Sequence, residues 1–313
     1  MAIAILMEDC AAEAKLFGVI YKNDKYVLCT SNNNRRYVFA FRERRRIRAM
    51  PQFSAPGVCP VEALGLPEAA RGRLRRLCPG ARTVLVYLFP YFAGTRPGNL
   101  SLYARGRDYH AVIQEALAPE ADALRAAHPG NRFLVLADAS PIPEVRAAAL
   151  AGLGVLGENG LLIHETFGSY VFIGTVVTDL AMPGEAKPVR ACLRCGRCQK
   201  ACPGGALRGA GVCLSALTQQ GGALSAEEEA LLRRHPLIWG CDLCQLACPM
   251  NAGVPLAGTP PFREDLIDSL EAGALAGLTR RAFAEKYPGR AFTWRGPAPL
   301  RRNLALQEQE EPS

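Results

Sequence analysis

The residues with the clearest chemistry in this sequence are eight cysteines confined to residues 192–248. One run has the spacing C-x2-C-x2-C-x3-C-P, a second has C-x2-C-x3-C-P, and one further cysteine lies between them. Cysteine thiolates are the usual ligands of iron–sulfur clusters, and a cubane takes one thiolate for each iron. The spacing therefore predicts iron–sulfur chemistry at these residues: Cys192, Cys195, Cys198, Cys202, Cys213, Cys241, Cys244 and Cys248.

Both runs have the pattern of bacterial ferredoxins with two [4Fe–4S] clusters, in which the cysteine before the proline binds the other cluster. Counting on this basis assigns the first cluster to Cys192, Cys195, Cys198 and Cys248. It assigns the second cluster to Cys202, Cys213, Cys241 and Cys244. Zinc is a weaker alternative, because a third cysteine two residues on and a proline after both runs are not zinc-ribbon spacing. A disulfide framework requires an oxidising compartment, which nothing in the sequence indicates.

Length and hydrophobicity predict a two-domain protein of the cytoplasm. The chain has 313 residues, of which 49% are hydrophobic, so a packed core and two domains are expected. No apolar run approaches the roughly 18 residues needed to cross a bilayer. The first residues, MAIAILMEDC, lack a basic segment and make a poor signal peptide. We therefore expect a cytoplasmic location, reduced thiols and no membrane partner.

The charge is moderately basic and unevenly distributed. The formal net charge is +8 and the pI is about 9.0, which permits a polyanionic partner such as RNA. Two arginine groups lie within residues 35–48 and 71–76. Either group can be a solvated face or a set of phosphate contacts, and the sequence leaves both open. The remaining cysteines have no ligand spacing and are expected to be buried free thiols: Cys10, Cys29, Cys59 and Cys78.

The order of strands and helices predicts an α+β fold with a layered domain over about residues 80–182. Apolar segments predict strands at 83–89, 133–137, 161–163 and 170–178, and two short strands within 21–41. Helices are predicted from an Asp108 N-cap, with Pro119 interrupting, and over 143–150. The predicted domains are 1–185, of which 1–80 is atypical and basic, a double-cluster domain at 186–258, and a helical tail at 259–313.

Asp138 is the candidate catalytic residue outside the cysteine region. It directly follows the predicted strand 133–137, and the end of a strand is where a sheet presents chemical groups. The alternative is that it caps the following helix, for which Ser140 is better placed. Gly152, Gly154 and Gly157 resemble a dinucleotide motif, but they follow a helix rather than a strand, so they do not predict a Rossmann site.

Several segments together resemble the epoxyqueuosine reductases, which are cobalamin-dependent enzymes of the last step of queuosine synthesis in tRNA. They are YARGRDYH at 103–110, ADASPIPE at 137–144, AGLGVLGENGLLIHETFGS at 151–169, the cysteine region with CLSALT and WGCDLCQLACP, and RRNLAL at 301–306. The resemblance covers about residues 80–306. Val155 and Glu158 depart from it, because the family usually has an aromatic residue and a lysine at these positions.

The resemblance implies a cobalamin-binding domain followed by a double [4Fe–4S] ferredoxin-like domain. It implies action on a tRNA anticodon loop, with electrons from an external low-potential donor. Asp138 matches the family's acid over the cobalt. The segment that helps to form the substrate pocket corresponds to Arg105, Asp108, Tyr109 and His110. The residues near the corrin correspond to Gly152, Gly154, Gly157, Asn159, Phe167, Gly168 and Ser169.

Together these expectations predict that the protein reduces epoxyqueuosine to queuosine in tRNA, with Asp138 as the proton donor. Such an acid would need a pKa raised by burial to hold its proton at neutral pH. Two alternatives remain open from the sequence. One is a corrinoid enzyme similar to reductive dehalogenases, and the other is a non-catalytic iron–sulfur carrier or activator of a corrinoid protein.

Overall fold

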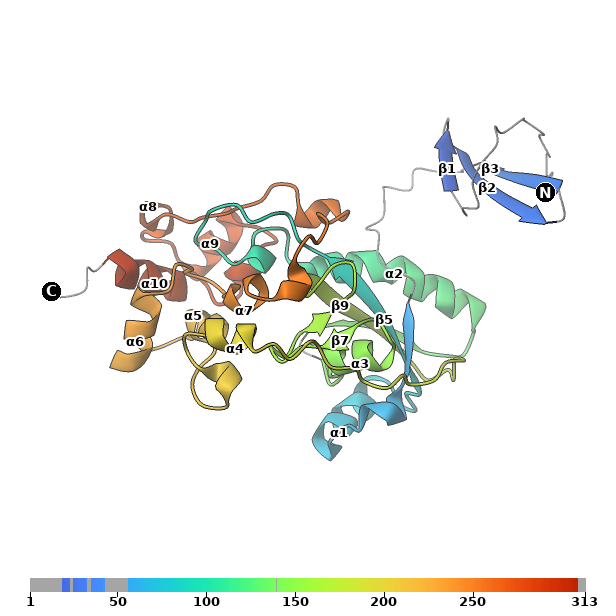
Figure 1. Ribbon diagram of the computed structural model, residues 1–313, viewed down its shortest axis with the longest axis horizontal. Helices are drawn as coiled ribbons and strands as arrows, with labels where there is room; N and C mark the ends of the chain where they lie inside the picture. The colour runs from blue at the N-terminus through green and yellow to red at the C-terminus, as the bar shows by residue number, and fades with distance from the viewer. Residues whose placement is uncertain (1–18, 23–24, 33–34, 43–55, 139, 309–313) are drawn as a thin grey trace. The chain divides into compact units, whose positions relative to one another are not determined.

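The computed structural model describes residues 19–22, 25–32, 35–42, 56–138 and 140–308. Residues 1–50 and 51–313 form two compact units (Figure 1). The first unit contains β1 Val19–Lys22, β2 Lys25–Asn32 and β3 Arg35–Arg42 in an antiparallel sheet. Strands β2 and β3 confirm the predicted pair, whereas β1 was not predicted. The arginines at 44–46 lie outside the described residues.

The sheet of the second unit carries the candidate site at one edge. It consists of β4 Gly57–Pro60, β5 Thr83–Pro90, β9 Val171–Thr178 and β6 Phe133–Ala137, in the order β4-β5-β9-β6. All neighbouring pairs are antiparallel. Since β5 and β6 both oppose β9, they run in the same direction and end at the edge where β9 begins. The layered α+β prediction is confirmed, with an antiparallel sheet.

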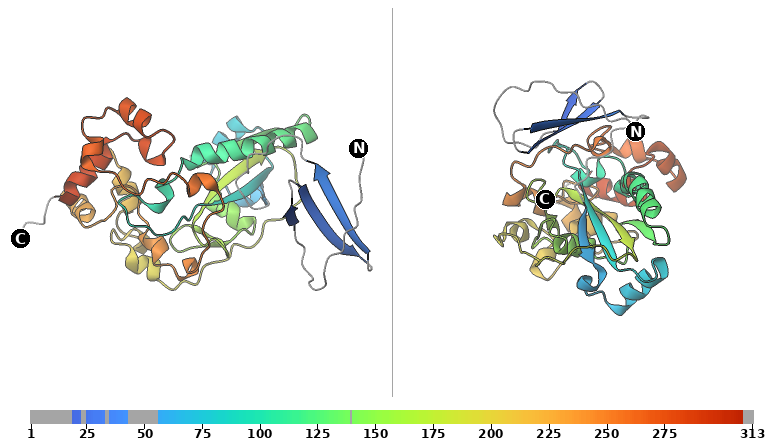
Figure 2. Two further views of the ribbon diagram at one scale, coloured as in Figure 1. Left: turned by 90° about the horizontal axis from the view of Figure 1, so that it is seen from above. Right: turned by 90° about the vertical axis from the view of Figure 1, so that its right-hand side faces the viewer.

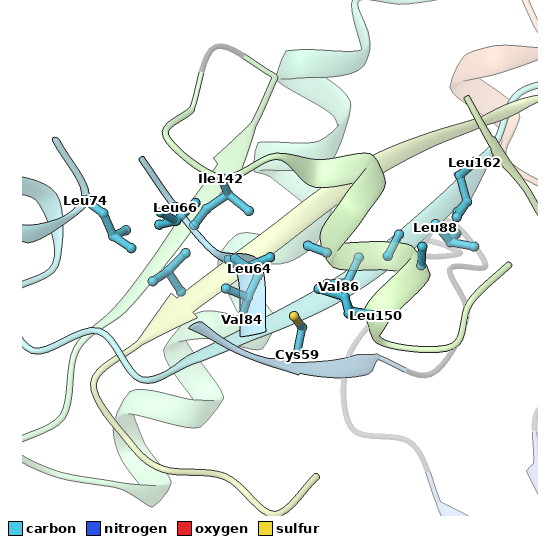
Figure 3. Packing of buried hydrophobic residues seen from close by; sticks show 14 of the residues in the cluster. Cys59, Leu64, Leu66, Leu74, Val84, Val86, Leu88, Ile142, Leu150 and Leu162 are labelled. Carbon is cyan, nitrogen blue, oxygen red and sulfur yellow. The ribbon is translucent and has the colours of Figure 1, made fainter. Parts of the chain in front are cut away.

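Helices cover both faces of this sheet because β5 alternates its buried side chains between them. Leu85, Tyr87 and Phe89 pack with residues of α2 Tyr109–Ala127. Val84, Val86 and Leu88 pack on the other face with α3 Glu144–Leu150 and with Leu64 and Leu66 (Figure 3). The second cluster also includes the buried thiols Cys59 and Cys78, as predicted for both. The side chains of Cys10 and Cys29 lie outside the described part.

Helix α2 confirms one sequence prediction and corrects another. Asp108 is its N-cap, and the side chain accepts a hydrogen bond from the His110 backbone N–H at 3.0 Å. Pro119 does not interrupt the helix, which continues to Ala127. Proline removes one helical hydrogen bond, but Leu117 and Ala121 are fully buried on either side of it. We infer that this packing holds the helix together across Pro119.

Smaller elements connect these layers. They are η1 Val61–Leu64, α1 Glu68–Leu77, η2 Leu102–Ala104 and the hairpin of β7 Val155–Leu156 with β8 Leu162–Ile163. Strand β8 and helix α3 match their predictions within one residue, and β7 was not predicted. In the described part of the chain, no helix combines the length and apolar character needed to cross a membrane.

The cysteine region and the C-terminal segment consist of short helices (Figure 2). Those of the cysteine region are α4 Arg197–Ala201, η3 Ala206–Arg208, α5 Leu214–Gln219, α6 Ala226–Arg233, α7 Leu243–Leu246 and η4 Pro249–Asn251. Those that follow are η5 Pro260–Phe262, α8 Ala272–Leu275, α9 Arg280–Lys286, η6 Ala291–Thr293 and α10 Ala298–Glu308. Phe283 and Phe292 share one core with Leu100 and Trp239, so residues 259–308 are integrated with the rest. The three-part domain division stays a prediction.

Asn303 ties α10 to the cysteine region, and its removal should destabilise the protein. Its side-chain amide is 1% exposed and donates at 2.8 Å to the carbonyls of Thr218 and Ile238. Asn303→Ala leaves both buried carbonyls unpaired, at a cost of about 1–3 kcal/mol for each. We expect a lower thermal unfolding midpoint under anaerobic conditions. Gln114→Ala, which removes an exposed bond to the Val135 carbonyl, is the control and should stay within about 0.5 kcal/mol of wild type. Equal midpoints for the two variants would contradict this role of Asn303.

Candidate functional site

Asp138 lies directly after β6 and is the centre of a group of polar side chains. Its Oδ2 accepts a hydrogen bond from the Tyr109 hydroxyl at 2.5 Å and lies 3.2 Å from His110 Nε2. The other ring nitrogen, His110 Nδ1, lies 2.7 Å from Asp108 Oδ1. The structure therefore brings together Asp138 and three of the predicted substrate residues. The carboxylate does not cap α3, because Pro143 is the N-cap of that helix.

The charges of this group favour a protonated His110. Hydrogen bonds to Asp108 and then to Asp138 raise the pKa of His110 to about 9. At neutral pH, a cationic imidazole therefore lies between the two carboxylates. The burial that we expected around Asp138 is not found, since its side chain is 58% exposed. The reason is its position beyond the end of the strand, in a left-handed backbone conformation with a φ of 54°.

Aromatic packing fixes the orientation of Tyr109. Its ring stacks on Phe172 of β9 with a centroid distance of 4.4 Å and an interplanar angle of 7°. Phe172 stacks in turn on Tyr91, which follows β5, at 4.4 Å. A pocket beside this stack is lined by Tyr103, Tyr109, Asp138, Glu144, Val171, Phe172 and Ile173. The end of β6 and the start of β9 thus supply Asp138 and an apolar wall to one pocket, and Tyr91 at the end of β5 packs behind it.

Glu144 is a member of this pocket that the sequence analysis did not single out. Burial, and then the negative charge of Asp138, raise the pKa of Glu144 to about 8. Its Oε1 is buried and has no hydrogen-bond partner among the described residues. An acidic residue in the first turn of a helix is ordinarily explained by the helix dipole. The sequence feature that could have identified Glu144 is its position six residues after Asp138, in the segment ADASPIPE.

Arg105 has a different environment from the other predicted substrate residues. The residue is 5% exposed, and its guanidinium donates to the carbonyls of Leu100 and Arg96 and to the Asp268 carboxylate. These contacts join residues 96–105 to the C-terminal segment. The guanidinium of Arg105 therefore binds backbone carbonyls and Asp268. The Tyr109 hydroxyl and the His110 ring instead bind Asp138.

The glycines predicted near a corrin are required first by the chain's own packing. A Cβ on Gly154 would lie 2.6 Å from the Ile163 carbonyl oxygen. Gly168 has a φ of 56°, and a Cβ there would collide with the Asn251 side chain. Asn251 also accepts a hydrogen bond from the Ser169 N–H at 2.8 Å. Of the remaining members of this predicted set, Gly157 and Asn159 lie in the turn between β7 and β8, whereas Gly152 precedes the hairpin and Phe167 follows it.

Four cysteines from both runs line one cavity, and they are the four assigned to the first cluster: Cys192, Cys195, Cys198 and Cys248. Asn159 lies in the wall of the same cavity. Its Oδ1 accepts from the Leu161 N–H at 3.3 Å, and its Nδ2 is buried without a partner among the described residues. A donor left free beside four thiols suits a cluster whose sulfurs accept hydrogen bonds.

The other four cysteines also lie close to one another. Burial raises the pKa of Cys241 to about 11, with further contributions from Asp242, Cys213 and Cys202. Burial likewise raises the pKa of Cys244 to about 12, with further contributions from Cys241, Cys213, Cys198 of the first set and Cys202. Within the described ranges, no three His, Cys, Asp or Glu side chains converge on a single metal ion.

Comparison with known protein families gives two matches along the chain. Residues 191–251 match the 4Fe-4S double cluster binding domain. Residues 71–139 match a domain described as epoxyqueuosine reductase QueG, DUF1730. The first match agrees with the cluster type predicted from the cysteine spacing, and the second covers β5, α2 and β6 with Asp138.

The most similar curated relatives are epoxyqueuosine reductases. The one from Lactococcus garvieae is 34% identical over 67% of this chain and 61% of the relative. The one from Synechocystis sp. is 32% identical over 76% of this chain and 87% of the relative. The chain thus spans less than two thirds of the L. garvieae protein and most of the Synechocystis protein.

Solved structures of epoxyqueuosine reductases share this fold. One, in complex with an epoxyqueuosine-modified tRNA-Tyr stem loop, is 25% identical with a TM-score of 0.68 and covers 83% of this chain and 76% of the other. Another, from Bacillus subtilis, is 27% identical with a TM-score of 0.66 and covers 79% and 71%. In the latter, the loop with a catalytic aspartate is swung out of the active site.

The crossed cluster assignment makes a prediction that differs from sequential pairing, in which the four cysteines of the first run would hold one cluster and the other four the second. Cys198→Ser and Cys248→Ser lie in different runs but should damage the same cluster, leaving about four irons per chain. Cys202→Ser should damage the other cluster. Iron content and EPR spectra of the anaerobically reduced variants measure this. The assignment is wrong if Cys198→Ser removes the same EPR signal as Cys202→Ser, as sequential pairing requires, and Cys248→Ser removes the other.

Proposed function

Because this chain belongs to the epoxyqueuosine reductase family, we propose that it reduces epoxyqueuosine to queuosine in tRNA. The observation that carries the proposal is the placement of Asp138, with Tyr109 and His110, beside a double-cluster domain. Loss of the epoxide oxygen as water requires two electrons and two protons. A protein for this reaction must therefore combine an electron supply with proton donors at one pocket.

We propose that the two cysteine sets each hold a [4Fe–4S] cluster, with the crossed ligands given above. The cavity lined by Cys192, Cys195, Cys198 and Cys248 supports the first set. The effects of Cys202 and Cys213 on both Cys241 and Cys244 support the second. Cys244 acts on Tyr91, and Cys248 and Cys244 both act on Tyr170, so cysteines of both sets lie close to the aromatic residues behind the pocket.

We propose cobalamin as the third cofactor, held beside Asp138. The partly exposed apolar side chains of Val171 and Ile173, which line the pocket with Asp138, suit a flat apolar macrocycle. The segment Gly152–Asn159 and the turn Phe167–Ser169 are the further residues that would hold it. When bound, cobalamin supplies a strong cobalt nucleophile and a store for electrons that arrive one at a time.

The residues of the pocket handle the protons. Asp138 lines the pocket and is proposed to protonate the departing oxygen there. His110 Nε2 lies 3.2 Å from Oδ2 of Asp138. Because the pKa of His110 is about 9, its imidazole is protonated at neutral pH and can return a proton to Asp138. The Asp108 carboxylate stabilises the cationic imidazole from its other side. The proposed acid is therefore the hydrogen-bonded pair of Asp138 and protonated His110, rather than a carboxyl group kept neutral by burial.

The proposed partners are a tRNA anticodon loop and an external low-potential electron donor, in the cytoplasm. A relative bound to a modified tRNA stem loop supports the RNA partner. Arg73 and Arg76 on α1 are exposed and form no ion pair with a carboxylate in the described part of the chain, which suits phosphate contacts. Arg71 and Arg75 pair with Glu68 instead.

Turnover of a tRNA stem loop carrying epoxyqueuosine tests the proposed function. Anaerobic protein supplied with cobalamin and a chemical reductant should yield queuosine, measured by mass spectrometry. Asp138→Asn keeps the side-chain shape but has no acidic proton, and we expect a loss of about 10²-fold or more. Glu62→Gln on η1 is an exposed control and should turn over like wild type.

The alternatives predict different outcomes of the same assay. An iron–sulfur carrier would give no queuosine and no response to cobalamin. Wild-type turnover by Asp138→Asn would leave the activity in place but exclude this residue as the acid.

A further inference from the structure

The chain around the first set of cysteines carries an excess of positive charge. Residues 186–213 contain no aspartate or glutamate but six cationic residues: Lys187, Arg190, Arg194, Arg197, Lys200 and Arg208. All six are exposed, and none forms an ion pair with any carboxylate that the structure describes. Protein surfaces ordinarily intersperse both signs of charge, so this excess indicates a negatively charged partner.

Apolar side chains are exposed in the same part of the chain. Leu193 is 67% exposed, and Leu156 and Val189 are each 39% exposed. Leu156 lies beside this segment, because its N–H donates to the Arg190 carbonyl at 2.8 Å and its carbonyl accepts from the Cys192 N–H at 3.0 Å. Protein interfaces combine an apolar centre with a polar rim. We call these three residues and the six cations the basic surface, and they have that composition.

The basic surface borders the cavity of the first cysteine set. Leu193 and Arg194 line this cavity together with all four cysteines of the set, and Cys195 is exposed. Helix α4 carries Cys198 and two further cations of the surface. Among the described residues of the cavity wall, Glu158 is the acidic one. Because electron transfer slows steeply with distance, a protein docked on this surface is well placed to deliver electrons to these cysteines' cluster.

The second cysteine set is a less suitable place for an acidic partner. Its exposed member is Cys213, which directly precedes α5. Helix α5 contacts α6, whose first turn contains Glu227, Glu228 and Glu229, of which Glu229 pairs with Arg233. Negative charge repels an acidic protein, so the charge distribution favours the first set as the point of electron entry.

We propose that the basic surface is the docking site of a small acidic electron-carrier protein, which delivers electrons at the first cysteine set. The proposal rests on the proposed function, because that reaction requires an external donor. In each encounter the carrier gives up one electron and the protein gains it, with no group transferred. Two encounters supply the two electrons that loss of the epoxide oxygen requires.

RNA is the other polyanion that a basic surface attracts, and the observations favour a protein. Residues 186–213 contain no phenylalanine, tyrosine or tryptophan on which an unpaired base could stack. Exposed aliphatic side chains at the centre suit an apolar contact between proteins. The cysteine cavity and the Asp138 pocket share none of their described lining residues, so a carrier and a tRNA loop need not compete for one site.

Removing charge from the basic surface should weaken binding of the carrier. The probe is a bacterial flavodoxin, a small acidic flavin protein, titrated anaerobically by calorimetry into protein with both clusters oxidised. The combined variant replaces three cations: Arg190→Gln, Arg194→Gln and Lys200→Gln. We expect its Kd to rise about tenfold at low salt and to match wild type at about 1 M salt, where surface charges are screened.

A matched control removes three other exposed cations: Arg82→Gln, Arg132→Gln and Arg263→Gln. Its net charge changes equally, so it separates local docking from the overall charge of the protein. Arg82 and Arg132 directly precede β5 and β6, and none of the three lines the cysteine cavity. We expect its Kd to stay within about twofold of wild type, because distant charges are screened.

The apolar centre has a test that salt does not affect. Leu193→Ser should weaken flavodoxin binding about fivefold at both salt concentrations, because truncating an apolar contact costs affinity whatever the charges. Leu77→Ser is the control and should bind like wild type, since Leu77 is 50% exposed on α1 and lies outside the basic surface.

Stopped-flow reduction of the clusters is the second readout. Reduced flavodoxin at low concentration should reduce the combined variant about tenfold more slowly than wild type. Dithionite, a small reductant that needs no docking surface, should reduce both at the same rate. Equal iron contents and equal dithionite rates identify intact clusters. If the combined variant loses iron, the salt dependence of wild-type binding and the Leu193→Ser comparison still decide the proposal.

These outcomes are independent of the reductase activity. Flavodoxin binding and cluster reduction need no tRNA, so they decide the proposal even when wild type gives no queuosine. Wild-type protein that does not bind flavodoxin, or a combined variant that binds it as tightly as the control does, would overturn the proposal. A combined variant that loses affinity only for a tRNA stem loop would also overturn it, because the surface would then bind RNA.

Discussion

The insertion of β9 between β5 and β6 is the constraint on which the site depends. This order makes the ends of β5 and β6 and the start of β9 meet at one edge of the sheet. Phe172 of β9 can therefore stack on both Tyr91 and Tyr109. Tyr109 in turn binds Asp138. A different strand order would leave the aromatic residues and the carboxylate on separate edges.

The same edge connects the sheet to the cysteine region. Tyr91 shares hydrogen bonds with Gln245, and Gln245 donates to Ser169 just before β9. Gln245 follows Cys244 directly, and Asp242 binds the Ser101 hydroxyl and the Leu102 N–H. The ligands of the proposed second cluster are thus anchored to residues next to the pocket. The proposed electron path and the proton relay consequently converge on one aromatic group.

The sequence predicted best where a local pattern determines the outcome. The cysteine spacing predicted a domain with two 4Fe-4S clusters, in agreement with the family match over residues 191–251. Short apolar segments predicted β5, β6 and β9 within about one residue of their bounds. Asp138 was found because it follows an apolar strand. Pro119 shows the limit of local rules, because tertiary packing on both sides of it kept α2 continuous.

The parts that the sequence did not predict depend on contacts between distant segments. The burial of Glu144 arises from its packing near Asp138, which a pattern of residues cannot show. The buried position of Arg105 depends on Asp268, which lies 163 residues away. The expected burial of Asp138 failed for the same reason, because exposure at a strand end is set by the neighbouring loops. The proton that burial was expected to keep on Asp138 is held instead by His110, between Asp108 and Asp138.

The central claim is that this chain brings a corrinoid and two clusters together at the Asp138 pocket, and cobalamin binding tests it most directly. Cobalamin would be titrated anaerobically into protein of known iron content and followed by its absorbance and EPR spectra. The account predicts about eight irons per chain and saturation near one cobalamin per chain. It also predicts no imidazole ligand from the protein, because no histidine lies in an Asp-x-His-x-x-Gly motif. A cobalamin spectrum that stays unchanged in protein with both clusters would contradict the account.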